Sequence, residues 1–144
     1  MSGVTLVEQV PDVLLPYMDR WVIQEPQAAD LQIMQAMQAQ MDAGVAWMLR
    51  HGLVYVFLRR VTPFRGEVHL YNLGSTWGMV RGFKAITKAA LEGFHKLEAR
   101  TADKRHGSVM MRCGWKHEAT YEKSHMTPTG LVNEYGYGVA RWEA

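Results

Sequence analysis

The chain contains a single cysteine, Cys113, and no long apolar run. One cysteine excludes an internal disulfide and suits a reducing compartment. A helix that crosses a bilayer needs about 20 consecutive apolar residues, so we expect neither a transmembrane span nor a membrane partner. The N-terminus lacks a basic segment followed by an apolar one, and the sequence therefore predicts no secretory signal peptide.

An excess of one charge is absent as well. The chain has 16 Lys and Arg residues and 14 Asp and Glu residues, which gives a formal net charge of +2. This balance gives no reason to expect a nucleic-acid partner. Residues 104–106 with Lys84 and Lys88 form only a modest basic patch, typical of a solvated face. The chain has no P-loop or Rossmann glycine pattern, and its histidines lack metal-ligand spacing, so we expect no metal site.

What remains is the composition of a globular protein. The 144 residues are 48% hydrophobic and 21% charged, which predicts one domain, residues 1–144, with a sizeable core. Ten methionines are many for this length. They serve either as flexible core filler or as an adaptable contact surface, and we favour the core.

Hydrophobic periodicity predicts the order of the elements. We expect helices over 12–24, 28–43, 79–94 and 103–113, and strands over 4–10, 45–50, 53–61, 67–73, 95–101, 116–126 and 131–142. In the helix over 28–43, Leu31, Met34, Met37 and Met41 form the expected core stripe. The order predicts an α/β (α+β) fold, a mixed sheet of about six to seven strands flanked by four helices.

The segment 103–115 carries the clearest local pattern. His106, Val109, Met110 and Cys113 recur at i, i+3, i+4 and i+7, so they share one face of a short helix. Asp103 suits the N-cap of this helix, because its carboxylate accepts a hydrogen bond from an unpaired backbone N–H. Gly114 suits the left-handed position that commonly ends a helix.

This spacing resembles a C-terminal signature of GNAT N-acetyltransferases, Asn-x-x-Ser-x-x-Leu-x-x-Lys/Arg-x-Gly-Phe. Here Arg112, Gly114 and Trp115 match it in kind, whereas Asp103 and His106 replace the Asn and the small residue. The order of elements is also similar to that of the GNAT fold. The resemblance therefore implies a GNAT-like domain.

In that family, acetyl-coenzyme A binds where the fourth strand meets the third helix, at Gln/Arg-x-x-Gly-x-Gly/Ala. Residues 79–84 read Met-Val-Arg-Gly-Phe-Lys, with the central glycine present and both flanking positions changed. Binding is therefore either retained, with the pyrophosphate at the start of the helix over 79–94, or lost. The resemblance implies these cofactor-binding residues: Val80, Arg81, Gly82, Lys84 and Asp103.

Catalysis in the family needs a base near the fourth strand and often a tyrosine that protonates the leaving thiolate. Glu67, His69 and Tyr71 share one face of the strand over 67–73 by the period of two. Glu67 or His69 is the candidate base, and an ordinary exposed Glu with a packed His is the alternative. Met110 and Met111 stand where the tyrosine is common.

The chain also resembles small GNAT-like proteins of bacteriophages, in which a strand like Glu-Val-His-Leu-Tyr at 67–71 precedes a degenerate cofactor loop. Our first hypothesis is a virion or head-assembly component in the virion or host cytoplasm, with weakened or lost catalysis. It would act through protein partners or self-assembly, with residues 135–142 as the contact edge. The alternative is an active acetyl-coenzyme A-dependent N-acetyltransferase acting on a protein N-terminus or a small amine.

Overall fold

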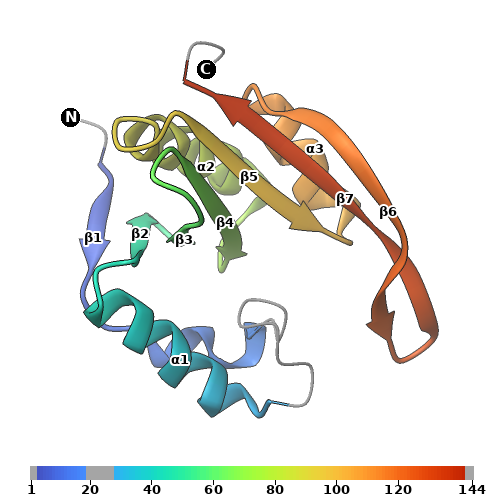
Figure 1. Cartoon of the computed structure of the whole chain (residues 1–144), viewed down its shortest axis with the longest axis horizontal. Coiled ribbons are helices and arrows are strands. Elements are labelled where there is room, and N and C mark those ends of the chain that lie inside the picture. Colours follow the sequence, from blue (N-terminus) through green and yellow to red (C-terminus); the bar gives the residue numbers. More distant parts are fainter. Residues whose placement is uncertain (1–2, 19–27, 142–144) are drawn as a thin grey trace.

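A computed structural model describes residues 3–18 and 28–141. It contains one seven-stranded sheet in the order β1-β2-β3-β4-β5-β7-β6 (Figure 1). The strands are β1 (Thr5–Val7), β2 (Ala46–His51), β3 (Val54–Arg60), β4 (Arg65–Asn72), β5 (Lys96–Thr101), β6 (Lys116–Thr127) and β7 (Gly130–Ala140). The helices are η1 (Asp12–Tyr17), α1 (Asp30–Asp42), α2 (Thr76–Ala90) and α3 (Lys104–Arg112). The predicted mixed sheet with four helices is confirmed.

Helices cover the sheet on both faces. The strand β3 is apolar on both of its faces because Val56 and Leu58 pack in the core under α2, while Tyr55 and Phe57 pack in the core under α1. The strand expected over 53–61 is therefore confirmed, and it is covered on both faces. The two helices α2 and α3 cover one face, and η1 and α1 cover part of the other (Figure 1).

The first two helices differ in detail from the prediction. The segment Asp12–Tyr17 is a 3-10 helix instead of the first part of an α-helix over 12–24. Pro16 lies inside it and has no N–H to donate, which disfavours a longer α-helix. Residues 19–24 lie outside the described part. In α1 the buried stripe is Ile33, Met34 and Met37, whereas Leu31 is 59% exposed, so the predicted stripe had Leu31 on the wrong face.

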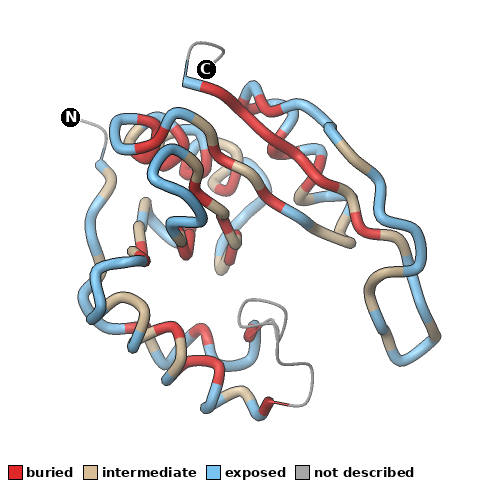
Figure 2. Tube along the Cα trace, in the orientation of Figure 1, coloured by how far each residue is buried: buried red, intermediate tan, exposed pale blue. Residues whose placement is uncertain are grey.

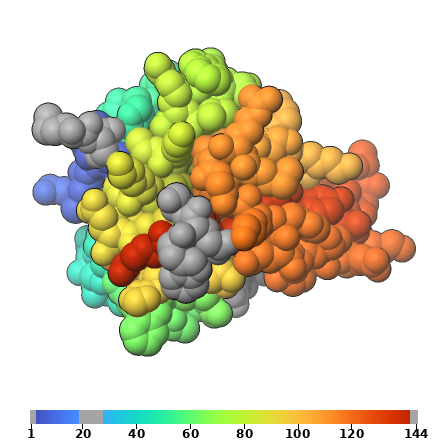
Figure 3. Space-filling model, turned by 90° about the horizontal axis from the view of Figure 1, so that it is seen from above, coloured from blue at the N-terminus to red at the C-terminus, as the bar shows by residue number. Residues whose placement is uncertain are grey.

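The strand β7 is the last along the chain but not the last in the sheet. It pairs with β5 on one side and β6 on the other, and much of it is buried while β6 is mostly exposed (Figure 2). The hypothesis that residues 135–142 form a free contact edge is therefore wrong for 135–138, because β7 is paired there with β5 on one edge and with β6 on the other. Trp142 lies outside the described residues. The far end of the β6–β7 hairpin projects from the body of the molecule (Figure 3).

Candidate functional site

A cleft lies where β4 and β5 separate. These two strands are parallel and pair only over Arg65–Val68 and Lys96–Ala99, then diverge toward their carboxyl ends (Figure 1). The helix α2 connects them as a crossover. The resulting cavity of about 610 Å³, here called the splay cleft, lies between β4, β5 and the first turns of α2 and α3. Crevices at the carboxyl ends of parallel strands are the usual ligand sites of such sheets.

The first turn of α2 faces this cleft. Gly74, Thr76 and Met79 line it, and Ser75 caps the helix by accepting a hydrogen bond from the Gly78 amide at 3.0 Å. The amides at the start of a helix and the positive end of its dipole together favour an anion such as a phosphate. The start of α2 therefore suits a pyrophosphate.

The helix begins three residues before the predicted start, and this moves four predicted cofactor residues away from its N-terminus. Gly82 is buried in the second turn, where an added Cβ would lie 2.7 Å from Val54 Cγ2. Arg81 and Lys84 are exposed, and the Val80 carbonyl accepts a hydrogen bond from Cys113 Sγ at 3.4 Å. The premise that these residues open the helix is wrong. They belong to its packed or solvated faces, and the splay cleft is lined by others.

Sequence reasoning missed Ser75, Thr76 and Gly78. Their signal was Ser75 itself, an N-cap residue that directly follows Gly74. The helix was placed too late because its apolar periodicity first becomes regular at Met79, whereas the hydrogen bond from Gly78 to Ser75 sets the actual start.

The first turn of α3 forms the opposite wall. Asp103 lines the cleft and, as predicted, caps α3 by accepting a hydrogen bond from the Arg105 amide at 2.8 Å. Burial raises the pKa of Asp103, but the hydrogen bonds from Arg105 and the charge of His106 outweigh burial and lower it. Burial lowers the pKa of His106, which lies 3.9 Å from Asp103. Met110, only 2% exposed, lines the cleft on the same helix face as His106.

The strand β4 carries the predicted catalytic residues. Glu67 Oε1 lies 2.8 Å from His69 Nε2 and 3.0 Å from an Arg59 guanidinium nitrogen. The hydrogen bond from His69, with the charges of His69 and Arg59, lowers the pKa of Glu67 to about 2 in spite of its burial. Tyr71 lies two residues further along the same face, is buried in the core under α1, and also lines the splay cleft.

This geometry ranks the two candidate bases. The hydrogen bonds from His69 and Arg59 occupy Glu67 Oε1 and favour its ionised form, which makes Glu67 a weak base. With His69 neutral and Nε2–H donating to Glu67, Nδ1 keeps a free lone pair that can accept a proton. His69 is therefore the better base, and Glu67 orients its ring. The catalytic roles of Glu67, His69 and Tyr71 stay predictions.

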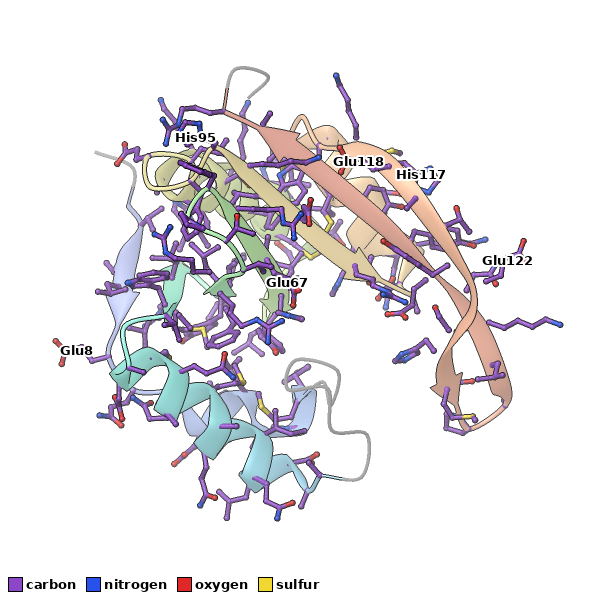
Figure 4. The ribbon with its side chains drawn as sticks, viewed as in Figure 1. Glu8, Glu67, His95, His117, Glu118 and Glu122 are labelled. Atoms are coloured by element: carbon purple, nitrogen blue, oxygen red, sulfur yellow. The ribbon has the colours of Figure 1, made fainter. Side chains whose placement is uncertain are left out.

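A second cavity lies on the sheet face that carries Glu67 and His69. It has a volume of about 560 Å³ and spans β4, β5, β7 and β6, and we call it the sheet trough. Its two sides are marked by Glu67 on β4 and Glu118 on β6 (Figure 4). His69, Arg100 and Glu134 line both the trough and the splay cleft. The two cavities therefore meet beside His69.

Sequence reasoning also missed Arg100 and Glu134. Arg100 Nε lies 3.2 Å from Glu134 Oε1, across two strands that are 34 residues apart at these positions. The β5–β7 ladder creates this pair, and no local pattern in the sequence indicates it.

The remaining candidate chemistry is limited. Burial raises the pKa of the Cys113 thiol to about 11, so it is poorly reactive. Within residues 3–18 and 28–141, no three His, Cys, Asp or Glu side chains are grouped closely enough to hold a metal ion. Across the same residues, every helix is too short or too polar to cross a membrane.

Comparison with known proteins gives structural neighbours but no sequence relatives. No protein-family model and no curated protein sequence matches the chain. The solved structures that match include spermidine N-acetyltransferase from Vibrio cholerae in complex with CoA and spermine, with 12% identity, a TM-score of 0.66, and 99% of this chain and 98% of that one covered. The ribosomal L7/L12 α-N-protein acetyltransferase RimL, in complex with coenzyme A, has 9% identity, a TM-score of 0.68, and coverage of 97% and 95%.

A third match is the ribosomal-protein-S5-alanine acetyltransferase from Vibrio fischeri, with 12% identity, a TM-score of 0.65, and coverage of 96% and 92%. All three are acetyltransferases by name, and the similarity extends over nearly the whole of each chain. The chain therefore has the GNAT acetyltransferase fold, as expected. The resemblance to bacteriophage head-assembly proteins finds no support among these neighbours.

Proposed function

We propose that this chain is an acyl-coenzyme A-dependent N-acyltransferase, with the cofactor in the splay cleft and the acceptor amine in the sheet trough. One observation carries the proposal: the two cavities meet at His69, and the first of them begins at the N-terminus of α2. Two substrates that enter from opposite sides can react at such a junction.

The residues of the splay cleft fit a coenzyme A molecule. The amides of the first turn of α2 suit the pyrophosphate, and Leu70, Met79 and Met110 provide apolar wall for an uncharged arm. When bound, acyl-coenzyme A supplies an activated thioester. The structural neighbours from Vibrio cholerae and RimL are complexes with CoA, which supports the same ligand here.

The side chains at the junction can then prepare the acceptor. His69 Nδ1 accepts a proton from the amine, and the Glu67 carboxylate stabilises the resulting imidazolium across 2.8 Å. Arg59 holds Glu67 in place at 3.0 Å. Met110 has no proton to give to the leaving group, so we expect turnover to be slow.

The proposal is tested by ligand-induced stabilisation. Saturating acetyl-coenzyme A must raise the Tm of the full chain, because a ligand at about 100 times its Kd stabilises the native state by about 2.7 kcal/mol. Thr76→Asp places a negative charge in the first turn of α2, which suits the helix dipole but repels a pyrophosphate. We expect this variant to fold and to lose the shift in Tm.

Thr76→Asn is the matched control, since it has nearly the same size and no charge, and it should keep the shift. Absence of any shift in the unmodified chain would overturn the proposal. Equal shifts in the Asp and Asn variants would place the cofactor elsewhere.

The role as a virion or head-assembly component stays a prediction. The neighbours are acetyltransferases by name, and the proposed contact edge is paired on both sides over residues 135–138. The interior position of β7 lowers our preference for this hypothesis, which we place second.

A further inference from the structure

The charges of the sheet trough indicate which amine it accepts. We propose that the acceptor is the α-amine of an extended polypeptide and that polyamines are poor acceptors; this inference rests on the proposed N-acyltransferase function. Both kinds of acceptor occur among the named neighbours. What distinguishes them here is the pairing of the trough's own carboxylates.

The trough has the shape for an extended chain. It crosses four neighbouring strands, from β4 to β6, and three spacings between strands make about 14 Å. An extended polypeptide covers that distance with about four residues. The trough meets the splay cleft along His69, Arg100 and Glu134, so a chain that lies across the strands with its first residue over β4 brings that residue to the base.

Two glycines of β7, Gly136 and Gly138, lie beneath side chains that line the trough. An added Cβ at Gly136 would lie 3.2 Å from the ring of Tyr121, and the Glu118 side chain occupies the corresponding place over Gly138. The two glycines of β7 thus let side chains of β6 lie down across the sheet. The space above them stays open for an acceptor.

Each carboxylate that lines the trough already has a cationic partner. The ion pairs are Glu67 with Arg59 at 3.0 Å, Glu98 with Arg65 at 3.4 Å, Glu118 with Lys96 at 2.9 Å and Glu134 with Arg100 at 3.2 Å. Four positive groups therefore match the four negative ones; Arg100 lines the trough itself, and Arg59, Arg65 and Lys96 reach the glutamates from beside it. This pairing offsets much of the negative charge that would attract a polycation.

This balance affects the two classes of acceptor differently. A glutamate already paired with Arg or Lys has little charge left to attract a further ammonium, so the several charges of a polyamine gain little here. A polypeptide N-terminus brings one ammonium followed by neutral amides. Its amide N–H groups can donate to the remaining lone pairs of the glutamates, and a carbonyl oxygen can accept from Arg100.

The proposed acyl transfer accounts for every bond and proton. The ammonium first loses one proton to solvent, which frees the lone pair of the α-nitrogen. The neutral α-nitrogen then forms a bond to the acyl carbon, the thioester C–S bond breaks with its electron pair going to sulfur, and the second proton leaving the nitrogen goes to His69 Nδ1.

The test compares acceptors on the full chain with acetyl-coenzyme A, by the rate of free-thiol release. The acceptors are a lysine-free tetrapeptide amide, the same peptide with an N-formyl group, and spermidine. We expect kcat/KM for the tetrapeptide to exceed that for spermidine at least about tenfold, and no reaction of the blocked peptide. A preference for spermidine, or reaction of neither acceptor, would overturn the inference.

A double variant tests the charge argument directly. Arg65→Gln with Lys96→Gln leaves Glu98 and Glu118 without these partners, and should raise the ratio of spermidine to tetrapeptide turnover about tenfold. Lys88→Gln with Arg112→Gln removes the same charge from exposed positions on α2 and α3 and should leave the ratio unchanged. An unchanged ratio in the first variant would overturn the inference.

The two levels of failure can be separated. If acetyl-coenzyme A stabilises the chain but spermidine is the better acceptor, the N-acyltransferase function stands and the acceptor class is wrong. If acetyl-coenzyme A gives no shift in Tm, the proposed function itself fails.

Discussion

Glu67 accepts hydrogen bonds from two sides, and the resulting pKa of about 2 makes stability depend on pH. A carboxyl group whose folded pKa lies below its unfolded value of about 4.5 stabilises the fold above pH 4.5. That contribution is lost as the pH falls from 4.5 toward 2. We expect a loss of about 2 kcal/mol, allowing for screening by the water that reaches about a third of the side chain.

Glu67→Gln should remove this part of the pH dependence, because an amide does not titrate. The measurement is the free energy of unfolding in urea at pH 7, 4.5 and 3 for the unmodified chain and the variant. Glu92→Gln, at an exposed position after α2, controls for the loss of one charge. If Glu67→Gln retained the full acid sensitivity, the hydrogen bonds around Glu67 would not be the cause.

For single residues, the sequence predicts those features that depend on the local alternation of side chains. Glu67, His69 and Tyr71 were expected on one face because side chains alternate along a strand, and the structure places them so. The partner of Glu67 was not predicted. Arg59 reaches it through the register of the β3–β4 ladder, which pairs Arg59 with Glu67, and register across strands is not visible in a local pattern.

Among the elements, α2 shows how a boundary error changes a functional assignment. The helix itself was predicted, with Phe83, Ile86 and Ala90 on its buried face. Its start was set three residues too late, and Gly82 was therefore assigned to a phosphate. In the structure Gly82 lets the second turn of α2 lie close to β3 and to the His51 carbonyl oxygen.

Gly82→Ala should therefore lower stability while leaving affinity for acetyl-coenzyme A unchanged. Its Cβ would lie 2.9 Å from Val54 Cβ and 3.2 Å from the His51 carbonyl oxygen. Overpacking of this kind costs about 1 to 3 kcal/mol, and the better helix propensity of alanine offsets at most about 1 kcal/mol. The effect is measured as the shift of the urea midpoint, with the ligand titrated below that midpoint.

Gly78→Ala is the matched control for stability, since it lies in the same helix and its Cβ would meet only Ser75 Oγ at 3.2 Å. We expect a change within about 0.5 kcal/mol, because the contact is offset by the gain in propensity. If Gly82→Ala left stability intact and removed only the ligand, Gly82 would contact the phosphate as the sequence first suggested.

For the molecule as a whole, the order of elements was predictable and the order of strands was not. The last two strands were expected at 116–126 and 131–142, and they pair with each other across the short connection between them. Which of them lies beside β5 depends on packing against α3, where the buried Tyr137 contacts Gly107. Nothing local in residues 116–141 encodes that choice. The predicted contact edge failed for this reason.

The same sheet joins two separate cores, and this leads to a prediction about cooperativity. Met37 is buried in the core under α1, and Ile86 is buried in the core under α2. Because β3 contributes side chains to both cores, losing one core should destabilise the other. We expect the described residues to unfold in one transition, as one domain.

Met37→Ala and Ile86→Ala should each lower the stability of the whole chain by about 2 to 5 kcal/mol, through loss of buried surface and the cavity left behind. The measurement follows unfolding in urea by far-UV CD and by the near-UV CD of the aromatic side chains. One of these is Trp115, whose ring centroid lies 5.2 Å from that of Phe83 in the core under α2. In both variants, the urea midpoints of the far-UV and near-UV signals should decrease by the same amount. If Met37→Ala caused an early loss of helical signal while the near-UV signal kept its original midpoint, the two sides of the sheet would be separate folding units.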